Sequence, residues 1–402
     1  MVKFPRRHGF LSVEALGFLY HFSTFVMKKE HRLFPRLRTI FDSYHNGLSY
    51  LEIVFKLSKP HGITSLGKGK YLVSLWASSN FYVIDLNARR IESRNLSGGN
   101  GHRARPGRIT GAFAPKERQE IFSTYQFFDK RHNQTYFTTF FRERGEEVAR
   151  DRHVTIKKYG WDTDQVAEVW DGEFGEATHY IAVSEGGRHL GLVQFGDYFD
   201  GEKRLLPSRI LVLDMKDGKE WWIDNTGWSP TAHIDWDPVE DNVCYLSCHN
   251  GVILPNHDLL GFYFKKVYKW KIFGPASIHK YRIAAHGPEK VGIFTHDELL
   301  RMTIHKVFVH RGKSLIACTG FPNYVFFADA ESMKYVRKVG VFERSGAKSV
   351  VGSLYPSPDG EKVFLITTGS FQVIDVESGV VEEVLGLGRI YDPFNHMISV
   401  RE

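Results

Sequence analysis

The chain has 402 residues, of which 42% are hydrophobic and 14% aromatic, which is enough for a buried core and too much for a disordered protein. The net charge of +7 is moderate, and the basic groups at 28–38 and 103–108 lack interleaved stacking aromatics, so a nucleic-acid partner is disfavoured. No stretch approaches the roughly 20 apolar residues of a membrane span, so we expect a soluble protein. Three cysteines cannot staple a fold of this size and favour a reducing compartment, which we expect to be the cytoplasm.

The first 50 residues carry the weakest pattern. Residues 13–27 are compatible with a helix, and extended segments follow within 38–57. The apolar-leaning stretch at 10–27 contains charged and hydroxyl residues and no small-residue cleavage site, which argues against a signal peptide. We therefore predict that residues 1–50 form a partly helical N-terminal extension that also contributes to closing the fold.

From residue 61 onward, short strands rich in β-branched and aromatic residues alternate with turns at Gly, Ser, Asn and Asp. Units of about four strands recur every 40 to 70 residues or so, which is the sequence signature of a β-propeller. In three units a strand ends in two apolar residues and an aspartate, at Asp85, Asp214 and Asp375. Six units are legible, and they open at His61, Thr110, His179, His233, His305 and Ser353.

The sequence thus predicts an all-β fold, a single β-propeller domain over residues 1–402. We expect seven blades, with six as the alternative. The seventh blade would combine strands from 38–57 with one near 396–400, because ring closure removes exposed sheet edges. In the fourth unit the later strands are expected at 261–268 and 269–273. The stretch 274–304 fits no blade, and we predict an insertion over one face.

Four of the six units open with a histidine in the same register. From each opening residue to the second strand there are 10 or 11 residues, and Thr110 and Ser353 occupy the slot in the other two units. Innermost strands of a propeller surround the axis, so equivalent residues converge there. Neutral imidazoles on separate strands are good ligands for Mn, Fe, Zn and Cu. The alternative is that these side chains line a wet channel or bond backbone carbonyls. The predicted metal ligands are His61, His179, His233 and His305.

Further candidates are charged or sulfur-containing. A basic group precedes the second unit, where arginines would bind a carboxylate through paired hydrogen bonds. Its members are Arg103, Arg105 and Arg108, and Arg108 is the candidate catalytic arginine. His249, near a glycine turn, is the second candidate catalytic residue. Cys244 and Cys248 have no second cysteine pair nearby, so Cys244 is expected in the core rather than in a zinc site. Asp235 and Asp237 are expected to stabilise the turn at 238–242 rather than to act in catalysis.

The segment HIDWDPVEDNVCYLSCHNG at 233–251, followed by VYKWKI at 267–272, resembles the oligogalacturonate lyase family over about one blade. In that family a blade opens His-x-x-x-x-Pro, and its second strand runs into a Cys-His-Glu-Gly turn before an Ile-Trp strand. Here Asn250 stands at the glutamate position. The resemblance implies axial histidines holding manganese, with His233 and His305 matching the blade-opening histidines, and an arginine that assists proton abstraction beside a carboxylate.

The function expected from these features is metal-dependent catalysis at the axis, of the lyase or epimerase type, on a small-molecule substrate with a carboxylate or carbonyl. The divalent metal, Mn or Fe, would act as a Lewis acid and acidify the adjacent C–H. The count of four histidines is also similar to that of carotenoid-cleaving oxygenases, which implies Fe(II) as one alternative. The other alternative is a non-enzymatic binding platform, because the propeller fold alone does not specify function.

Overall fold

The computed structural model describes the chain from residue 60 to residue 386 with gaps. Its regular elements are the strands β1 to β26, and this part of the chain contains no helix that is long and apolar enough to cross a bilayer. The described residues are 60–67, 70–75, 80–85, 88, 90–95, 119–142, 153–173, 178–194, 208–225, 231–248, 251–256, 267–272, 275–299, 302, 304–320, 323–341, 351–367 and 370–386.

The described strands form six four-stranded antiparallel sheets, which are the blades, and one two-stranded hairpin. Blade 1 comprises β1 (Pro60–Gly67), β2 (Lys70–Leu75), β3 (Asn80–Asp85) and β4 (Arg90–Asn95). Blade 2 comprises β5 (Gln119–Asp129), β6 (Gln134–Arg142), β7 (His153–Gly160) and β8 (Gln165–Glu173). Blade 3 comprises β9 (Thr178–Val183), β10 (His189–Gln194), β11 (Ser208–Asp214) and β12 (Lys219–Asn225).

Blade 4 comprises β13 (Thr231–Trp236), β14 (Val243–Cys248), β17 (Ser277–Ala284) and β18 (Gly287–Thr295), and the hairpin pairs β15 (Gly251–Asn256) with β16 (Val267–Ile272). Blade 5 comprises β19 (His305–His310), β20 (Lys313–Gly320), β21 (Tyr324–Asp329) and β22 (Tyr335–Gly340). Blade 6 comprises β23 (Val351–Pro356), β24 (Lys362–Thr367), β25 (Ser370–Asp375) and β26 (Val381–Gly386).

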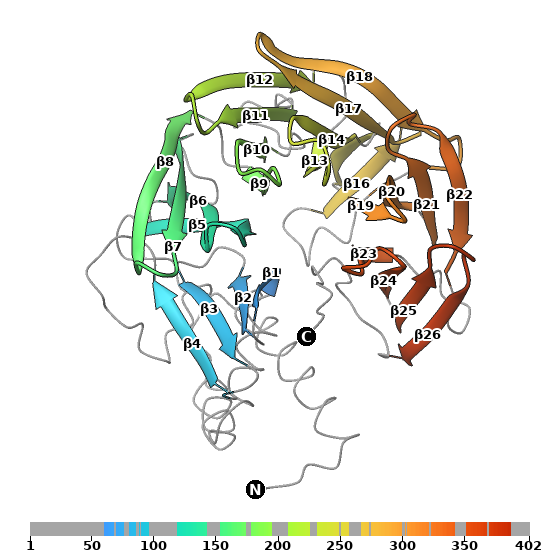
Figure 1. Ribbon diagram of the computed structural model, residues 1–402, viewed down its shortest axis with the longest axis horizontal. Helices are drawn as coiled ribbons and strands as arrows, with labels where there is room; N and C mark the ends of the chain where they lie inside the picture. The colour runs from blue at the N-terminus through green and yellow to red at the C-terminus, as the bar shows by residue number, and fades with distance from the viewer. Residues whose placement is uncertain are drawn as a thin grey trace, which may run out of the picture.

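The blades follow one another around a common axis, which confirms the predicted β-propeller (Figure 1). The first strand of each blade lies nearest the axis and the fourth lies at the rim. First strands of successive blades are neighbours, from β1 and β5 through to β19 and β23. The described strands leave one sector between blades 1 and 6 without a sheet. The predicted seventh blade, from 38–57 and 396–400, and the predicted extension at 1–50 lie outside the described residues, so they stay predictions.

The fourth blade corrects two predictions. The stretch 274–304 is not an insertion, because it supplies β17 and β18, the third and fourth strands of the blade. The inserted segment lies earlier and includes the β15–β16 hairpin, which separates β14 from β17. In place of the expected boundary between 268 and 269, the described residues 267–272 form one strand, β16, and residues 261–266 lie outside the described residues. The hairpin strands have the same apolar pattern as the strands of the blade. The sequence pattern therefore predicts, wrongly, that they belong to the blade sheet.

The second blade corrects one further boundary. Ile121 lies 11 residues after Thr110, a spacing that predicts the second strand of this unit. In the structure it belongs to the first strand, β5. Thr110 itself lies outside the described residues. The long apolar run of 119–129 explains the error, because it reads equally well as an inner strand or as the strand that follows.

The core consists of one apolar cluster between each pair of neighbouring blades. The sheets are buried on both faces, which is why β10 and β14 are buried at every position and why the continuous run Ile210–Leu213 is tolerated. Each fully buried aliphatic side chain contributes about 1.5 to 3 kcal/mol. Representative pairs from blade 1/2 to blade 5/6 are Leu72 with Phe137, Ile156 with Leu192, Ile210 with Ile234, Ile278 with Phe326, and Phe327 with Leu365.

An aspartate ends the third strand in four blades and fixes the turn that follows. Its carboxylate accepts the backbone N–H three residues further on, as in an Asx turn. This is the repeated strand-end aspartate of the sequence, with Asp329 as a further member. The bonds run from Ala88 to Asp85 (2.8 Å), from Asp217 to Asp214 (3.2 Å), from Ser332 to Asp329 (2.7 Å) and from Ser378 to Asp375 (2.8 Å).

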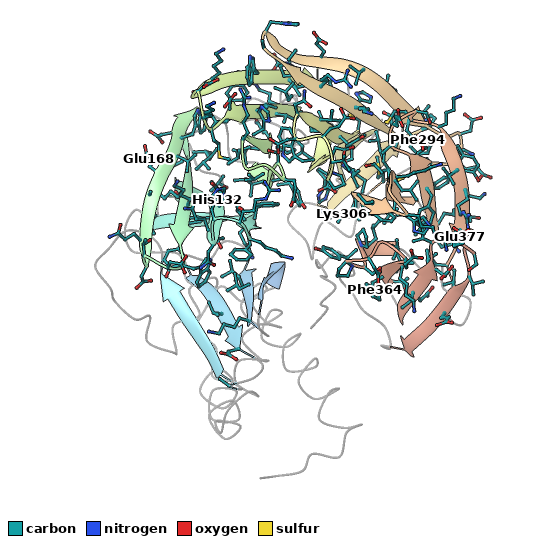
Figure 2. All side chains as sticks on the ribbon, in the orientation of Figure 1. His132, Glu168, Phe294, Lys306, Phe364 and Glu377 are labelled. Atoms are coloured by element: carbon teal, nitrogen blue, oxygen red, sulfur yellow. The ribbon has the colours of Figure 1, made fainter. Side chains whose placement is uncertain are left out.

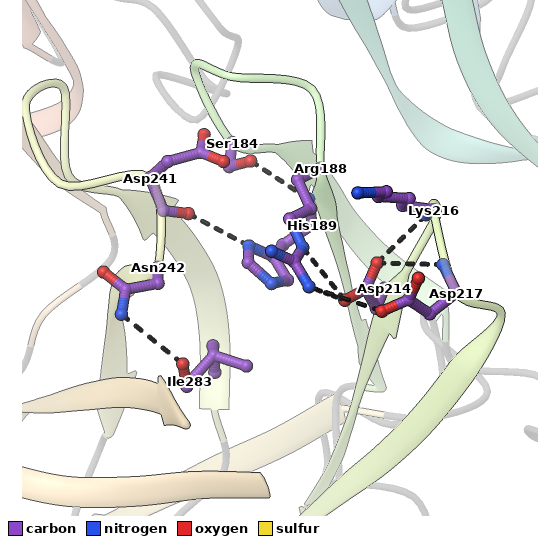
Figure 3. A network of polar contacts seen from close by, with 9 residues as sticks. All are labelled: Ser184, Arg188, His189, Asp214, Lys216, Asp217, Asp241, Asn242 and Ile283. Carbon is purple, nitrogen blue, oxygen red and sulfur yellow. Dashed lines mark hydrogen bonds and ion pairs between the residues drawn. The ribbon is translucent and has the colours of Figure 1, made fainter. Parts of the chain in front are cut away.

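Polar contacts between turns join neighbouring blades. The ring of His189 donates from Nδ1 to the Asp241 carbonyl oxygen of blade 4 at 3.1 Å (Figure 3). The Gly186 N–H donates to the Asp241 carboxylate. Within blade 3, Arg188 Nη2 donates to Asp214 at 2.8 Å. Burial alone would raise the pKa of Asp214, but Arg188 and nearby backbone N–H groups lower it below its ordinary range. The carboxylate therefore stays ionised and holds two turns together.

The junction of blades 5 and 6 is tighter still. His310 donates from Nδ1 to the Gly360 carbonyl oxygen at 2.9 Å. Gly360 has φ +69, and a Cβ at this position would lie 1.9 Å from the Val309 carbonyl oxygen. The adjoining two-residue loop, Arg311 and Gly312 with φ of 48 and 77, is of the type I′ kind that suits the twist of a hairpin.

We expect the three cysteines to be inert in the native protein. Cys244, Cys248 and Cys318 are free and buried, which confirms Cys244 as a core residue, and burial raises the pKa of the Cys244 and Cys318 thiols. Because the thiolate is the reactive form, Ellman's reagent should label none of them natively and all of them after denaturation. Rapid labelling of the folded protein would contradict this packing.

Candidate functional site

The four predicted histidines lie on the first strands of four blades, as the register required. His61 is on β1, His179 on β9, His233 on β13 and His305 on β19. The side chains of His61 and His179 lie outside the described residues. So do Arg108 and His249, the candidate catalytic residues, with Arg103 and Arg105. Their roles stay predictions.

Irregular pairing accompanies three of these histidines. In β1, Pro60 and Gly62 pair with consecutive residues of β2, which leaves His61 as an extra, bulged residue. The same pattern leaves His179 bulged between β9 and β10, and a bulge between residues 231 and 234 includes His233. A β-bulge bends its strand and redirects a side chain. Blade 6 has a comparable shift between residues 351 and 353, where no histidine is present.

His305 is completely buried against blade 4. Its Nε2–H donates to the Tyr245 carbonyl oxygen at 3.1 Å, and Nδ1 has no hydrogen-bond partner. Burial lowers the pKa of His305 to about 4, so the ring is neutral. His233 is also buried, with its ring edge-on to Tyr180 at 4.6 Å between centroids. Among the residues that the structure describes, no group of three or more His, Cys, Asp and Glu is placed to hold a metal ion.

A charged group next to these histidines occupies the axial side of the ring. Lys306 Nζ donates to Asp235 Oδ1 at 3.1 Å and to the Tyr180 hydroxyl at 2.8 Å. Asp235 Oδ2 accepts the Val307 backbone N–H at 3.0 Å. These side chains come from the first strands β9, β13 and β19 of three consecutive blades, and Figure 2 labels Lys306 on the inner side of the ring.

Tyr355 on β23 adds a fourth blade to this group. Burial raises the pKa of Tyr355, and the charges of Lys306 and Asp235 act on it as well. Its hydroxyl makes no hydrogen bond to any residue that the structure describes. We call Tyr180, Asp235, Lys306 and Tyr355 the axial cluster. The Lys306 and Asp235 side chains are each 15% exposed, so solvent reaches the cluster.

The axial cluster consists of an ion pair and two neutral phenols. Burial alone would lower the pKa of Lys306, but Asp235 and the Tyr180 hydroxyl outweigh it and raise the pKa above its ordinary value. For Tyr180, burial raises the pKa by more than the Lys306 ammonium lowers it. Lys306 is therefore charged and Tyr180 protonated at neutral pH. Such a group can donate hydrogen bonds and hold an acceptor in place.

Sequence reasoning reached the strands of this cluster but not its residues. Tyr180 follows His179, Lys306 follows His305, and Asp235 lies two residues after His233. Successive residues of a strand point to opposite faces, so one step along the strand changes what a side chain meets. The available signal was a charge within an otherwise apolar inner strand. Asp237 serves the turn as predicted, accepting from Val239 N–H at 2.8 Å, whereas Asp235 does not.

No protein-family model matches the chain, and no curated protein does. Among solved structures, Raptor of Chaetomium thermophilum is 11% identical with a TM-score of 0.50, and the alignment covers 81% of this chain and 25% of that one, so the chain spans a quarter of Raptor. Hydrazine synthase of Kuenenia stuttgartiensis is 11% identical with a TM-score of 0.50, covering 80% and 77%. Hsv2 of Kluyveromyces lactis is 12% identical with a TM-score of 0.44, covering 81% and 79%. The likenesses to Raptor and hydrazine synthase show the fold alone. The resemblance to oligogalacturonate lyases stays a prediction.

Proposed function

We propose that this chain is a β-propeller binding module whose ligand site is the axial cluster. The observation that carries the proposal is the convergence of Tyr180, Asp235 and Lys306 from the first strands of three consecutive blades, with Tyr355 on the neighbouring first strand β23. Removing a lysine and an aspartate from water costs several kcal/mol per ion unless other contacts offset it. A site that keeps both charges partly exposed at the hub is suited to a small polar or anionic ligand.

The electrostatics favour binding over acid–base catalysis. A general acid or base works best with a pKa near neutrality. In the described part of the chain, every shifted pKa moves away from neutrality. The pKa values of tyrosines and cysteines are raised, lysine and arginine stay charged, and carboxylates stay ionised. Burial lowers the pKa of His279 and of His305 to about 4. These groups support fixed charges and fixed donors rather than proton transfer.

Ligand-observed NMR with a mixed small-molecule library tests this function. Hits on the wild-type protein should disappear in Lys306→Met, because the ammonium organises the cluster. The matched control is Lys280→Met, since Lys280 is also buried and its Nζ donates to the Ala330 carbonyl oxygen at 2.9 Å, outside the axial cluster. Hits that persist in Lys306→Met, or the absence of any hit on the wild type, would contradict the proposal.

A metal-dependent enzyme is the second candidate, and His305 is the observation that favours it. A metal-bound histidine usually donates its other ring N–H to a carbonyl or carboxylate, as His305 does to Tyr245, and the buried Nδ1 is left available. The bulge that includes His233 would redirect its imidazole, and backbone bulges also lie at His61 and His179. A bound Mn or Fe would supply Lewis acidity. The nearby Lys306 ammonium weighs against a cation, which is why this function ranks second.

Metal content decides the second candidate. Full-length protein loaded with Mn(II) or Fe(II) should retain about one ion per chain if the four histidines form a site. The His233→Ala/His305→Ala double variant should lose it, whereas His310→Ala should keep it, because His310 is a buried histidine at the opposite end of β19. Equal metal content in all three proteins, or none in the wild type, would remove this candidate.

We further propose the cytoplasm as the compartment. All three cysteines are free and buried, and none pairs with another. Secreted chains with several cysteines usually form disulfides, whereas reducing compartments keep thiols free. The cysteine chemistry therefore supports an intracellular location.

A further inference from the structure

We propose that the axial cluster binds the carboxylate group of a small monoanionic ligand, an inference that rests on the binding function proposed above. The Lys306 ammonium has three N–H donors, and Asp235 and Tyr180 accept two of them. The third N–H has no acceptor among the described residues. The Tyr355 hydroxyl likewise has no partner there. The cluster thus presents two donors that the described residues leave unmatched.

Each oxygen of the Asp235 carboxylate already accepts one hydrogen bond. Asp235 Oδ1 accepts from Lys306 and Asp235 Oδ2 accepts from the Val307 N–H. A ligand that brings donors would share acceptors that already hold one hydrogen bond, whereas a ligand that brings acceptors meets two donors that have no partner among the described residues. A carboxylate supplies two acceptor oxygens in one plane and forms short, charge-assisted bonds to an ammonium group. Lys306 and Tyr355 lie on neighbouring first strands and near enough for the lysine charge to act on the phenol, so they offer these oxygens two donors.

The charge of the cluster restricts the class of ligand further. The charges of Lys306 and Asp235 cancel, so the four side chains of the axial cluster have no net charge. A monoanion shares the ammonium with Asp235 at moderate cost, but a phosphate dianion would place two further negative charges beside the Asp235 carboxylate. Like charges at such short range are mutually destabilising. A neutral primary amide offers one uncharged acceptor oxygen, so it forms a weaker hydrogen bond to the ammonium than a carboxylate does. The carboxylate is the group that satisfies both donors at least electrostatic cost.

Two tyrosine-to-phenylalanine variants separate binding from stability. Tyr355→Phe removes a hydroxyl that has no partner in the described chain, so the free energy of unfolding should stay unchanged. Tyr245→Phe removes a hydroxyl that donates to Asp237 Oδ2 at 2.9 Å and to the Ala330 carbonyl oxygen at 3.1 Å, deep between blades 4 and 5. That variant should lose stability and keep ligand affinity.

The experiment compares acetate and benzoate with acetamide and benzamide by saturation-transfer NMR on the full-length protein. The carboxylates should bind in the millimolar range, and Tyr355→Phe should weaken them about tenfold, the effect of losing one hydrogen bond to a charged group. Tyr245→Phe should bind them as the wild type does. The amides should bind at least tenfold more weakly than the carboxylates, by about the same reasoning.

The outcomes distinguish the two proposals. Amides that bind as well as carboxylates, with binding lost in Lys306→Met, would overturn the carboxylate assignment and leave the axial binding site standing. If neither Tyr355→Phe nor Lys306→Met changes carboxylate binding, the ligand binds elsewhere, and both the binding site and the ligand assignment are overturned. The absence of carboxylate binding overturns the ligand assignment, and the library screen then decides the binding function on its own.

Discussion

Replacing Gly360 by alanine should lower the free energy of unfolding by about 3 kcal/mol or more, since it combines two separate costs. At φ +69 an L-residue is strained by about 1 to 2 kcal/mol. In addition, the new Cβ would lie 1.9 Å from the Val309 carbonyl oxygen, a backbone atom that no side-chain rotation can move away. Relief requires that blades 5 and 6 separate, which also breaks the bond from His310 to Gly360.

The matched control is Gly218→Ala. Gly218 has φ +66, close to the value at Gly360, but nothing lies within 4 Å of a Cβ placed there. This variant should show the conformational cost alone, about 1 to 2 kcal/mol. Chemical denaturation of the two variants and the wild type gives both values. Equal losses at the two positions would mean that the blade 5/6 junction yields easily and that the contact with Val309 contributes nothing.

The repeat and its core were predictable because they follow from local rules. The run Ile210–Leu213 indicates a strand buried on both faces, and the aspartates that end third strands mark their turns. The fourth blade was not predictable in detail, because the β15–β16 hairpin carries the same alternation as a blade strand. Nothing in the sequence says that β14 pairs with β17, which begins 29 positions after β14 ends at Cys248. Long-range pairing is decided by which sheet edge is free, and that is a property of the folded ring.

The candidate site was predictable to the level of the strand. The register identified the first strands that carry His233 and His305, and both histidines are on them. It did not identify Lys306, because only the histidines share the register. Successive residues of a strand point to opposite faces, so Lys306 has other neighbours than His305. The bulges at His61 and His179 add a second difficulty. An extra residue reverses the alternation beyond it, so equivalent sequence positions in different blades need not face the same way.

Lys306→Met should be the most destabilising change at the axis, by about 3 kcal/mol. Removing one member of a buried ion pair typically costs 3 to 5 kcal/mol, and the 15% exposure of both partners places the value at about the lower end. The loss arises because Asp235 keeps its negative charge while it loses the ammonium group, and Tyr180 loses its donor. Asp235→Asn should cost a similar amount, since Lys306 is then left charged without a carboxylate.

The double variant Asp235→Asn/Lys306→Met tests whether the pair acts as a unit. Because it leaves no unpaired charge, its loss should be smaller than the sum of the single losses by about 1 to 3 kcal/mol. Urea denaturation of the four proteins at one pH and ionic strength measures this coupling. Purely additive losses would mean that water screens the two charges from each other. The hub would then be a solvated channel in which Lys306 is free to reorient, and the fixed donors on which the axial binding site depends would not exist.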